Sequence, residues 1–132
     1  MELMHDKYDL ARALMEGVSF ETRASLEEFA RHGADIRKLK MVGGAAKSDL
    51  WVKLTADITG CEIQIPAEKD TCCIGAAIIA AVGSGMYASY EDAARKMLRY
   101  CVTVQPEPAT AEFYHKKYAK YTENFASIKE CF

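Results

Sequence analysis

The chain has 132 residues, of which half are hydrophobic and 27% are charged, with 17 basic against 19 acidic side chains. This length and composition predict one compact soluble domain that can build a core without metal or disulfides. The formal charge of -2 argues against a nucleic-acid partner, because phosphate neutralisation requires clustered positive charge. The longest apolar run, Ile74–Val82, is far shorter than the roughly 18 residues of a membrane-spanning helix. We therefore expect a cytoplasmic protein with no membrane contact.

The chain predicts an α/β fold with few strands and several packed helices. The assignments follow the spacing of apolar residues, with glycine, proline and cap residues marking the ends. In chain order we expect a helix over residues 9–31, a strand over 37–42, a helix from 48 to about 60, a strand over 61–65, helices over 71–82 and from 89 to about 99, a short extended segment over 101–105, and a last helix after Pro108. Two or three strands make a thin sheet with unpaired edges, which indicates that the sequence is part of a larger domain.

Two of these helices indicate what packs against them. The helix over 71–82 is nearly all Ala, Ile and Cys, so we expect it to be covered by another helix or the sheet. A chain that exposes such a helix is expected to associate with itself, as a homo-oligomer. The last helix places four aromatic residues on one stripe, which we interpret as packing onto the parent domain, with a docking surface as the alternative. They are Tyr114, Tyr118, Tyr121 and Phe125.

The cysteines and histidines show no spacing typical of a metal site, so we assign no metal ligand. We interpret the cysteines as reduced thiols, mostly buried as small core residues. Two of them are adjacent, Cys72 and Cys73, and the others are Cys61, Cys101 and Cys131. The histidines, which we expect on the surface, are His5, His32 and His115.

The most informative segment is the turn from Val42 to Ser48, where a predicted strand feeds small residues into the start of a helix. Such a turn lets a ligand reach backbone N–H groups, which favours phosphate or nucleotide binding. It is not a P-loop, because Met41 and Ala46 stand where that motif has glycine, and no third glycine completes a dinucleotide-binding fingerprint. Taken as a bare Gly-Gly pair, the turn is more often structural than functional.

The longer string from Gly43 to Gly60 resembles the adenosine motif of the FGGY carbohydrate kinases. The family pattern is close to Gly-Gly-Gly-Ala-Lys/Arg-Ser-x-x-Trp-x-Gln-x-x-Ala-Asp-x-x-Gly, and most of it is matched here. The chain departs from the pattern at Ala45, where a third glycine is common, and at Lys53, where glutamine is common.

Three further segments at family spacing extend the resemblance over nearly the whole chain. Residues 10–20 resemble the helix that precedes the adenosine motif. Residues 70–77 resemble the Gly-Ala-Ala helix that follows it, with Asp70 in place of the usual glutamate, and residues 106–121 resemble the closing Pro-x-Pro…Tyr…Tyr segment. The chain is identified as a member of this family, most similar to its xylulokinase branch.

The resemblance implies a fold and a binding site. FGGY kinases have two actin-like, ribonuclease H-like ATPase domains that close on a sugar and ATP, and residues 1–132 resemble the last part of the second, a partial C-terminal nucleotide-binding domain. The matching positions imply an adenosine-binding turn at Gly43, Gly44 and Ala45, with Ser48 at the position that often hydrogen-bonds the base. Small residues suit this task because a flat ring can lie close to the backbone.

The resemblance also implies what this segment lacks. The phosphate motifs and the catalytic aspartate of the family lie upstream, so we assign no catalytic residue. Asp49, Asp57 and Asp70 each fit a helix-start or solvent role, while Val42 and Trp51 are expected to hold the turn from behind. The complete enzyme would use ATP and Mg²⁺ to phosphorylate a sugar hydroxyl, with the sugar bound mainly by the missing N-terminal domain, and this segment alone should be inactive.

Two other interpretations remain open at this point. The chain could be a stand-alone nucleotide-binding or regulatory module that dimerises through its open sheet edge and its aromatic stripe, without catalysis. It could also be a structural remnant of a truncated gene that folds and oligomerises but binds no nucleotide.

Overall fold

The structure is a computed structural model that describes residues 6–68 and 70–129. It confirms the expected α/β class, with a small sheet and several helices in the expected order. The elements are α1 (Lys7–Arg31), β1 (Lys38–Lys40), the 3-10 helix η1 (Ala45–Lys47), α2 (Asp49–Thr59), β2 (Glu62–Pro66), α3 (Thr71–Gly83), α4 (Tyr90–Met97), β3 (Tyr100–Val104) and α5 (Pro108–Lys129).

The sheet has three strands in the order β1-β2-β3. β1 runs parallel to β2, with Leu39 opposite Ile63, and β3 runs antiparallel to β2, with Val102 opposite Ile65. The predicted strand over 37–42 is shorter than expected, because the chain turns away soon after Met41 donates its backbone N–H to β2. Within the part of the chain that the structure describes, β1 and β3 are both edge strands.

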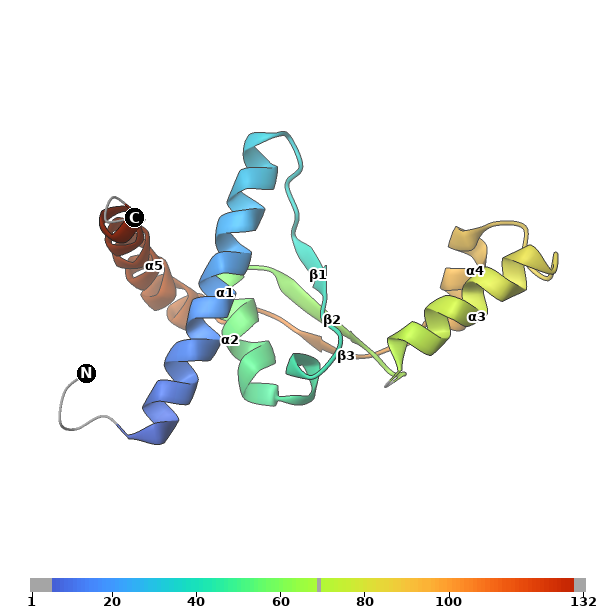
Figure 1. Cartoon of the computed structure of the whole chain (residues 1–132), viewed down its shortest axis with the longest axis horizontal. Helices are drawn as coiled ribbons and strands as arrows, with labels where there is room; N and C mark the ends of the chain where they lie inside the picture. The colour runs from blue at the N-terminus through green and yellow to red at the C-terminus, as the bar shows by residue number, and fades with distance from the viewer. Residues whose placement is uncertain (1–5, 69, 130–132) are drawn as a thin grey trace.

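Helix α2 forms the middle layer of the body, with the sheet on one side and α1 and α5 on the other (Figure 1). Every residue from Leu54 to Ile58 is buried. Side chains on opposite faces of α2 enter separate core clusters, as expected for a helix covered on both sides. One cluster faces the helices and consists of Phe20, Leu54, Ile58, Tyr114 and Tyr118. The other faces the sheet and centres on Val52, Ala56 and Ile63.

The aromatic stripe of α5 packs onto the body, as predicted. Tyr114 and Tyr118 are buried against Phe20 of α1, with ring centroids 6.3 and 5.7 Å from the Phe20 ring. Tyr121 is partly buried against the same ring, whereas Phe125 is exposed. The first three residues of the stripe therefore pack α5 against Phe20 of α1, and Phe125 does not.

Helices α3 and α4 form an arm that extends away from the sheet (Figure 1). The expectation that the helix over 71–82 is covered is wrong for this structure, since Ala81 is its one buried residue and Ile79 is 62% exposed. The element that packs on α3 is α4, and a single helix neighbour covers one face of another helix only. The apolar composition of α3 therefore leaves hydrophobic surface uncovered.

Helix α1 also buries a different face from the one its apolar spacing suggests. Leu10, Leu14 and Val18 are each more than half exposed. The buried face contains Glu16, Ser19 and Phe20 instead. The exposed stripe is thus a second uncovered apolar surface.

The expectation that the cysteines are mostly buried is wrong among the described residues. Cys61 is buried, where its thiol donates to the carbonyl of Ile36, but Cys72, Cys73 and Cys101 are exposed. His32 and His115 are exposed, as expected, and the predictions for His5 and Cys131 lie outside the described residues. No helix in residues 6–68 or 70–129 is long and apolar enough to span a membrane.

Candidate functional site

The turn after β1 is shaped by two glycines with different backbone conformations. Gly43 has φ +82°, in the left-handed region that glycine adopts at no steric cost. Gly44 has φ -63° and begins η1, whose hydrogen bonds run from Lys47 N to Gly44 O (3.1 Å) and from Ser48 N to Ala45 O (3.2 Å). The small residues thus form one tight 3-10 turn that leads directly into α2.

Ser48 begins α2 as its N-cap, as predicted. Its backbone is extended and its Oγ accepts the backbone N–H of Trp51 at 3.4 Å. A hydroxyl that accepts one hydrogen bond still has its proton to donate. The cap therefore fixes the Ser48 hydroxyl at the edge of the turn with a donor left for a ligand.

The turn separates two clefts. The first, which we call the Gly43 cleft, has a volume of about 260 Å³ and is lined by Gly43, Ala46 and Lys47, by the end of β2 and the segment after it, and by β3. The second, the Ala45 cleft, measures about 230 Å³ and lies between α1, β1 and α2, with Trp51 in its lining.

The four predicted site residues form one continuous turn but do not share one cavity. Gly43 lines the first cleft and Ala45 the second, while Gly44 and Ser48 line neither of these two. A Cβ added at Gly43 or Gly44 would meet nothing within 4 Å, so the space above both glycines is open. The turn thus presents backbone without side chains at these two positions, so that a flat ring could lie close to it.

Two residues were expected to support the turn from behind, and they behave differently. Trp51 is partly buried on the side of α1, in a position to support the turn. The expectation for Val42 is wrong, since it is 49% exposed and lines the Gly43 cleft. Val42 follows the last ladder hydrogen bond of β1, where the chain has already left the sheet.

Glu68 is a residue of the Gly43 cleft that sequence reasoning missed. Its Oε2 atom is buried and has no hydrogen-bond partner among the described residues. Most buried polar atoms in folded proteins are hydrogen-bonded, so this oxygen is exceptional. No motif or spacing in the sequence marks Glu68, because its burial depends on the path of the segment between β2 and α3.

The three aspartates near the motif have structural positions. Asp49 lies exposed in the first turn of α2 and Asp70 caps α3, as expected. The expected solvent role of Asp57 is wrong, because its side chain is 2% exposed. Its Oδ1 accepts the backbone N–H of Glu107 at 2.7 Å and the ammonium of Lys53 at 3.1 Å. Asp57 therefore fixes the end of α2 to the chain that enters α5.

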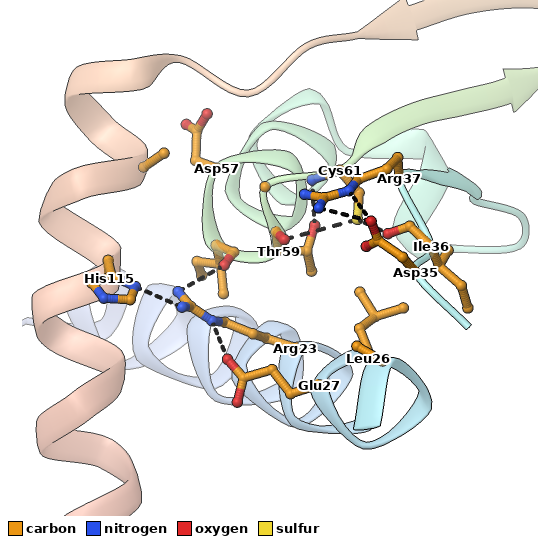
Figure 2. Close-up of a pocket in the computed structure, with 14 residues that line it drawn as sticks. Arg23, Leu26, Glu27, Asp35, Ile36, Arg37, Asp57, Thr59, Cys61 and His115 are labelled. Atoms are coloured by element: carbon orange, nitrogen blue, oxygen red, sulfur yellow. Dashed lines mark hydrogen bonds and ion pairs between the residues drawn. The ribbon is translucent and has the colours of Figure 1, made fainter. Parts of the chain in front are cut away.

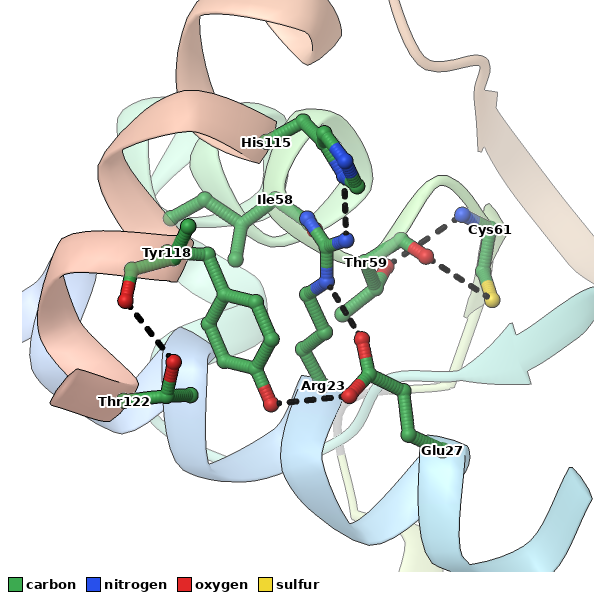
Figure 3. Close-up of polar contacts among 9 residues, drawn as sticks. Arg23, Glu27, Ile58, Thr59, Cys61, His115, Tyr118 and Thr122 are labelled. Atoms are coloured by element: carbon green, nitrogen blue, oxygen red, sulfur yellow. Dashed lines mark hydrogen bonds and ion pairs between the residues drawn. The ribbon is translucent and has the colours of Figure 1, made fainter. Parts of the chain in front are cut away.

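A third cleft, of about 290 Å³, lies where α1, the end of α2, the approach to β1 and α5 meet (Figure 2). Arg23 reaches across it, with Nε 3.0 Å from Oε1 of Glu27 and Nη1 donating to the carbonyl of Ile58 at 3.3 Å. Its Nη2 lies 2.7 Å from Nδ1 of His115 (Figure 3).

Tyr118 completes this group of contacts. Its hydroxyl donates to Oε2 of Glu27 at 3.1 Å, and the guanidinium carbon of Arg23 lies 4.3 Å from its ring centroid. Burial, together with the hydrogen bond to Glu27, raises the pKa of Tyr118 to about 12. Because the polar groups satisfy one another, we interpret the third cleft as a joint between three helices.

A groove of about 520 Å³ follows the contact between the first half of α1 and α5. At its base the carboxylate of Glu16, which is 5% exposed, receives hydrogen bonds from Tyr114 Oη (2.8 Å), Arg12 Nε (3.1 Å) and Lys117 Nζ. Burial by itself would raise the pKa of Glu16, but the hydrogen bonds from Lys117, Tyr114 and Arg12 hold it below its usual range. Glu16 is thus a fully paired carboxylate between two helices.

Comparison with known proteins places this fold and turn in a family. Residues 1–84 match the model of the FGGY family of carbohydrate kinases, C-terminal domain. The chain belongs to this family. It is 33% identical over 129 residues to the L-xylulose/3-keto-L-gulonate kinase of Escherichia coli (strain K12), a match that covers 98% of this chain and 26% of that protein. It is 28% identical over 130 residues to the xylulose kinase of Bacillus subtilis (strain 168), with the same coverage.

Solved structures of the family agree with the fold. The xylulose kinase from Rhodospirillum rubrum matches 98% of this chain with a TM-score of 0.83 at 26% identity, and the match covers 26% of that chain. The Plasmodium falciparum glycerol kinase with ADP matches 94% of it at a TM-score of 0.75 and 19% identity, over 25% of its own length, which shows the fold alone. The FGGY chain described here therefore has part of an actin-like ATPase fold and spans about a quarter of the length of its relatives.

Proposed function

We propose that this chain is the adenosine-binding segment of an ATP-dependent sugar kinase, in which the complete enzyme transfers the γ-phosphoryl group of ATP to a sugar hydroxyl. The observation that supports the proposal is the 3-10 turn from Gly43 to Ser48, which presents open backbone at the start of a capped helix in a member of the FGGY family. Relatives named as xylulose and L-xylulose kinases favour xylulose as the sugar.

Adenine would lie against Gly44 and Ala45, with the Ser48 hydroxyl donating to the base. Gly44 has room for a flat ring because no atom lies within 4 Å of the position of a Cβ. Ala45 adds only a methyl group to the same turn. The turn thus supplies shape and one hydrogen-bond donor, which bind a nucleoside but do not activate a phosphate.

We assign phosphoryl transfer to the part of the kinase that this chain does not span. Among the described residues, no group of three or more His, Cys, Asp or Glu side chains is arranged to hold a metal ion. Mg²⁺, the phosphate motifs, the catalytic base and the sugar pocket would come from the rest of the enzyme, which we place in the cytoplasm together with its substrate ATP. Residues 1–132 alone should bind nucleotide without catalysis.

We further propose that residues 1–132 form a partial domain and associate with one another when the rest of the kinase is absent. Leu10 and Leu14 on α1 and Ile79 and Met86 on the arm are all more than half exposed. Exposed apolar surface of this kind marks protein contacts. Light scattering of the purified chain should give a mass above the 14.7 kDa monomer, and a stable monomer would contradict this part of the proposal.

The adenosine site is tested by Gly44→Val. The φ of Gly44 suits any L residue, so the variant should fold, while its branched side chain occupies the space proposed for the ring. ADP binding by calorimetry should be lost. Gly17→Val in α1 is the matched control, since the same side chain there also meets nothing within 4 Å and Gly17 lines neither of the two clefts beside the turn. Equal ADP affinity in both variants would contradict the site assignment.

A further inference from the structure

We propose that this chain associates with a second copy of itself through α1, as an antiparallel pair of helices centred on Leu14. This inference rests on the self-association proposed above, because it names the interface and its orientation. Leu10, Leu14 and Val18 form the exposed apolar stripe of α1, and each is more than half exposed.

The exposed stripe and the buried face lie on opposite sides of α1. With 3.6 residues per turn, Leu10 and Val18 point within about 40° of the direction of Leu14. Glu16 and Phe20, which are buried on the side of the body, point roughly 160° and 120° away from that direction. Helix α1 can therefore pack on the body through one face and on a partner through the other.

Opposite charges stand at the two ends of this stripe. Lys7, Leu14 and Glu21 are spaced seven residues apart, and residues at this spacing lie on nearly the same line of a helix. Lys7 and Glu21 are both exposed, and neither forms an ion pair within the described residues. Lys7 lies over the ring of Tyr8, and Glu21 accepts the hydroxyl of Tyr121. Both charges are open to a partner.

This arrangement selects an antiparallel partner. With Leu14 opposite the partner's Leu14, Leu10 meets the partner's Val18, and Lys7 meets the partner's Glu21. Two-fold symmetry repeats both contacts, so an ion pair flanks the apolar centre on each side, about 10 Å along the axis. A parallel pair in register would place Lys7 against the partner's Lys7, which are like charges.

The arm exposes more apolar surface but carries no charges that would orient a partner. No charged residue occurs in α3, from Thr71 to Gly83. Ile79 and Met86 are exposed on the arm, which makes it the competing interface. Charge complementarity therefore favours α1.

The size of the stripe predicts a weak dimer. The segment from Lys7 to Glu21 is about 21 Å long and one helix wide, about 10–12 Å. Such a contact is smaller than the roughly 800 Å² that each partner buries in a standard interface. We expect a dimer Kd of about 10–100 μM.

Sedimentation equilibrium of the whole chain tests the interface. Leu14→Glu should weaken the dimer at least about tenfold, because it replaces an apolar contact at the two-fold axis with two facing carboxylates. Glutamate suits an exposed helix position, so this variant should fold. Ile79→Glu is the matched control on the arm, and its dimer Kd should stay within about twofold of the wild type.

A charge swap tests the orientation. Lys7→Glu and Glu21→Lys should each weaken the dimer about threefold to tenfold, because each turns both ion pairs into like-charge contacts. The double variant restores opposite charges in the antiparallel pair only, so its Kd should return to within about twofold of the wild type. Circular dichroism shows that each variant is folded.

Three results would overturn the inference. A weaker dimer in Ile79→Glu with an unchanged one in Leu14→Glu would place the interface on the arm and leave the self-association intact. A double variant as weak as the single ones would overturn the antiparallel orientation. A wild-type chain that is monomeric at about 500 μM would overturn the self-association and this inference together. The adenosine site is tested separately, by ADP binding.

Discussion

Replacing Glu16 with alanine should destabilise the protein by about 2–3 kcal/mol. The largest part of this loss of stability comes from Tyr114, which is 1% exposed. Its hydroxyl would lose the carboxylate that accepts its proton, at a cost of about 1–3 kcal/mol. Arg12 and Lys117, whose side chains are 51% and 45% exposed, can return to water. Loss of their pairing with Glu16 should therefore add less than about 1 kcal/mol.

Urea unfolding at pH 7, followed by circular dichroism, measures this loss directly. The same variant should lower the melting temperature by roughly 10 °C for a domain of this size. Glu112→Ala is the matched control, because it removes the same charge from an exposed pair with Lys116 on α5 and should cost less than about 0.5 kcal/mol. A free energy of unfolding for Glu16→Ala within about 0.5 kcal/mol of the wild type would show that the hydrogen bonds of Glu16 do not stabilise the fold.

A double-mutant cycle with Tyr114→Phe shows whether the cost arises from the hydrogen bond. The two substitutions remove the same bond, so their effects should not add, and the coupling between them should be about 1 kcal/mol or more. Additive effects would assign the loss to side-chain packing instead. The cycle therefore separates the 2.8 Å contact between Tyr114 and Glu16 from the other contacts between α1 and α5.

Three further predictions concern pH and backbone. The difference in free energy of unfolding between wild type and Glu16→Ala should have its full value at pH above the unfolded-state pKa of glutamate, about 4.3. It should shrink as the pH falls through the lower pKa that Glu16 has in the folded state. Equal differences at pH 7 and at about pH 2.5 would contradict this. Asp57→Ala should cost about 1–3 kcal/mol, because the N–H of Glu107 loses its hydrogen bond to a charged carboxylate that is itself buried; an unchanged urea midpoint would count against it. Gly43→Ala should cost about 1 kcal/mol of stability, because the φ of Gly43 is positive. Gly44→Ala should cost less than half of that. Equal losses of stability in thermal unfolding would show that the positive φ of Gly43 has no energetic effect.

The ends of the elements could be predicted from the sequence because local chemistry determines them. Ser48 and Ser89 accept the backbone N–H groups of α2 and α4, and Gly60 ends α2 with φ +69°. These are interactions within a few residues of the chain. The turn from Gly43 to Ser48 could be predicted for the same reason, since its glycines precede a capped helix.

Burial could not be predicted as well, because it depends on which elements lie nearby in space. The apolar composition of α3 predicts a covered helix, yet within the described residues α4 is the element that packs on it. Asp57 looked like a solvent-facing residue but lies under the entry to α5, fifty positions away from its backbone partner. Glu16 and Glu68 were missed for the same reason: a carboxylate in sequence gives no sign of the tertiary contacts that bury it.

The turn from Gly43 to Ser48 should bind an adenine nucleotide if the proposed function is right. The most direct test is calorimetric titration of the purified chain with ADP and with Mg-ATP. We expect saturable binding with a Kd of about 1 mM or tighter, present in Gly17→Val and absent in Gly44→Val. A folded chain that shows no binding up to roughly 10 mM nucleotide would contradict the claim.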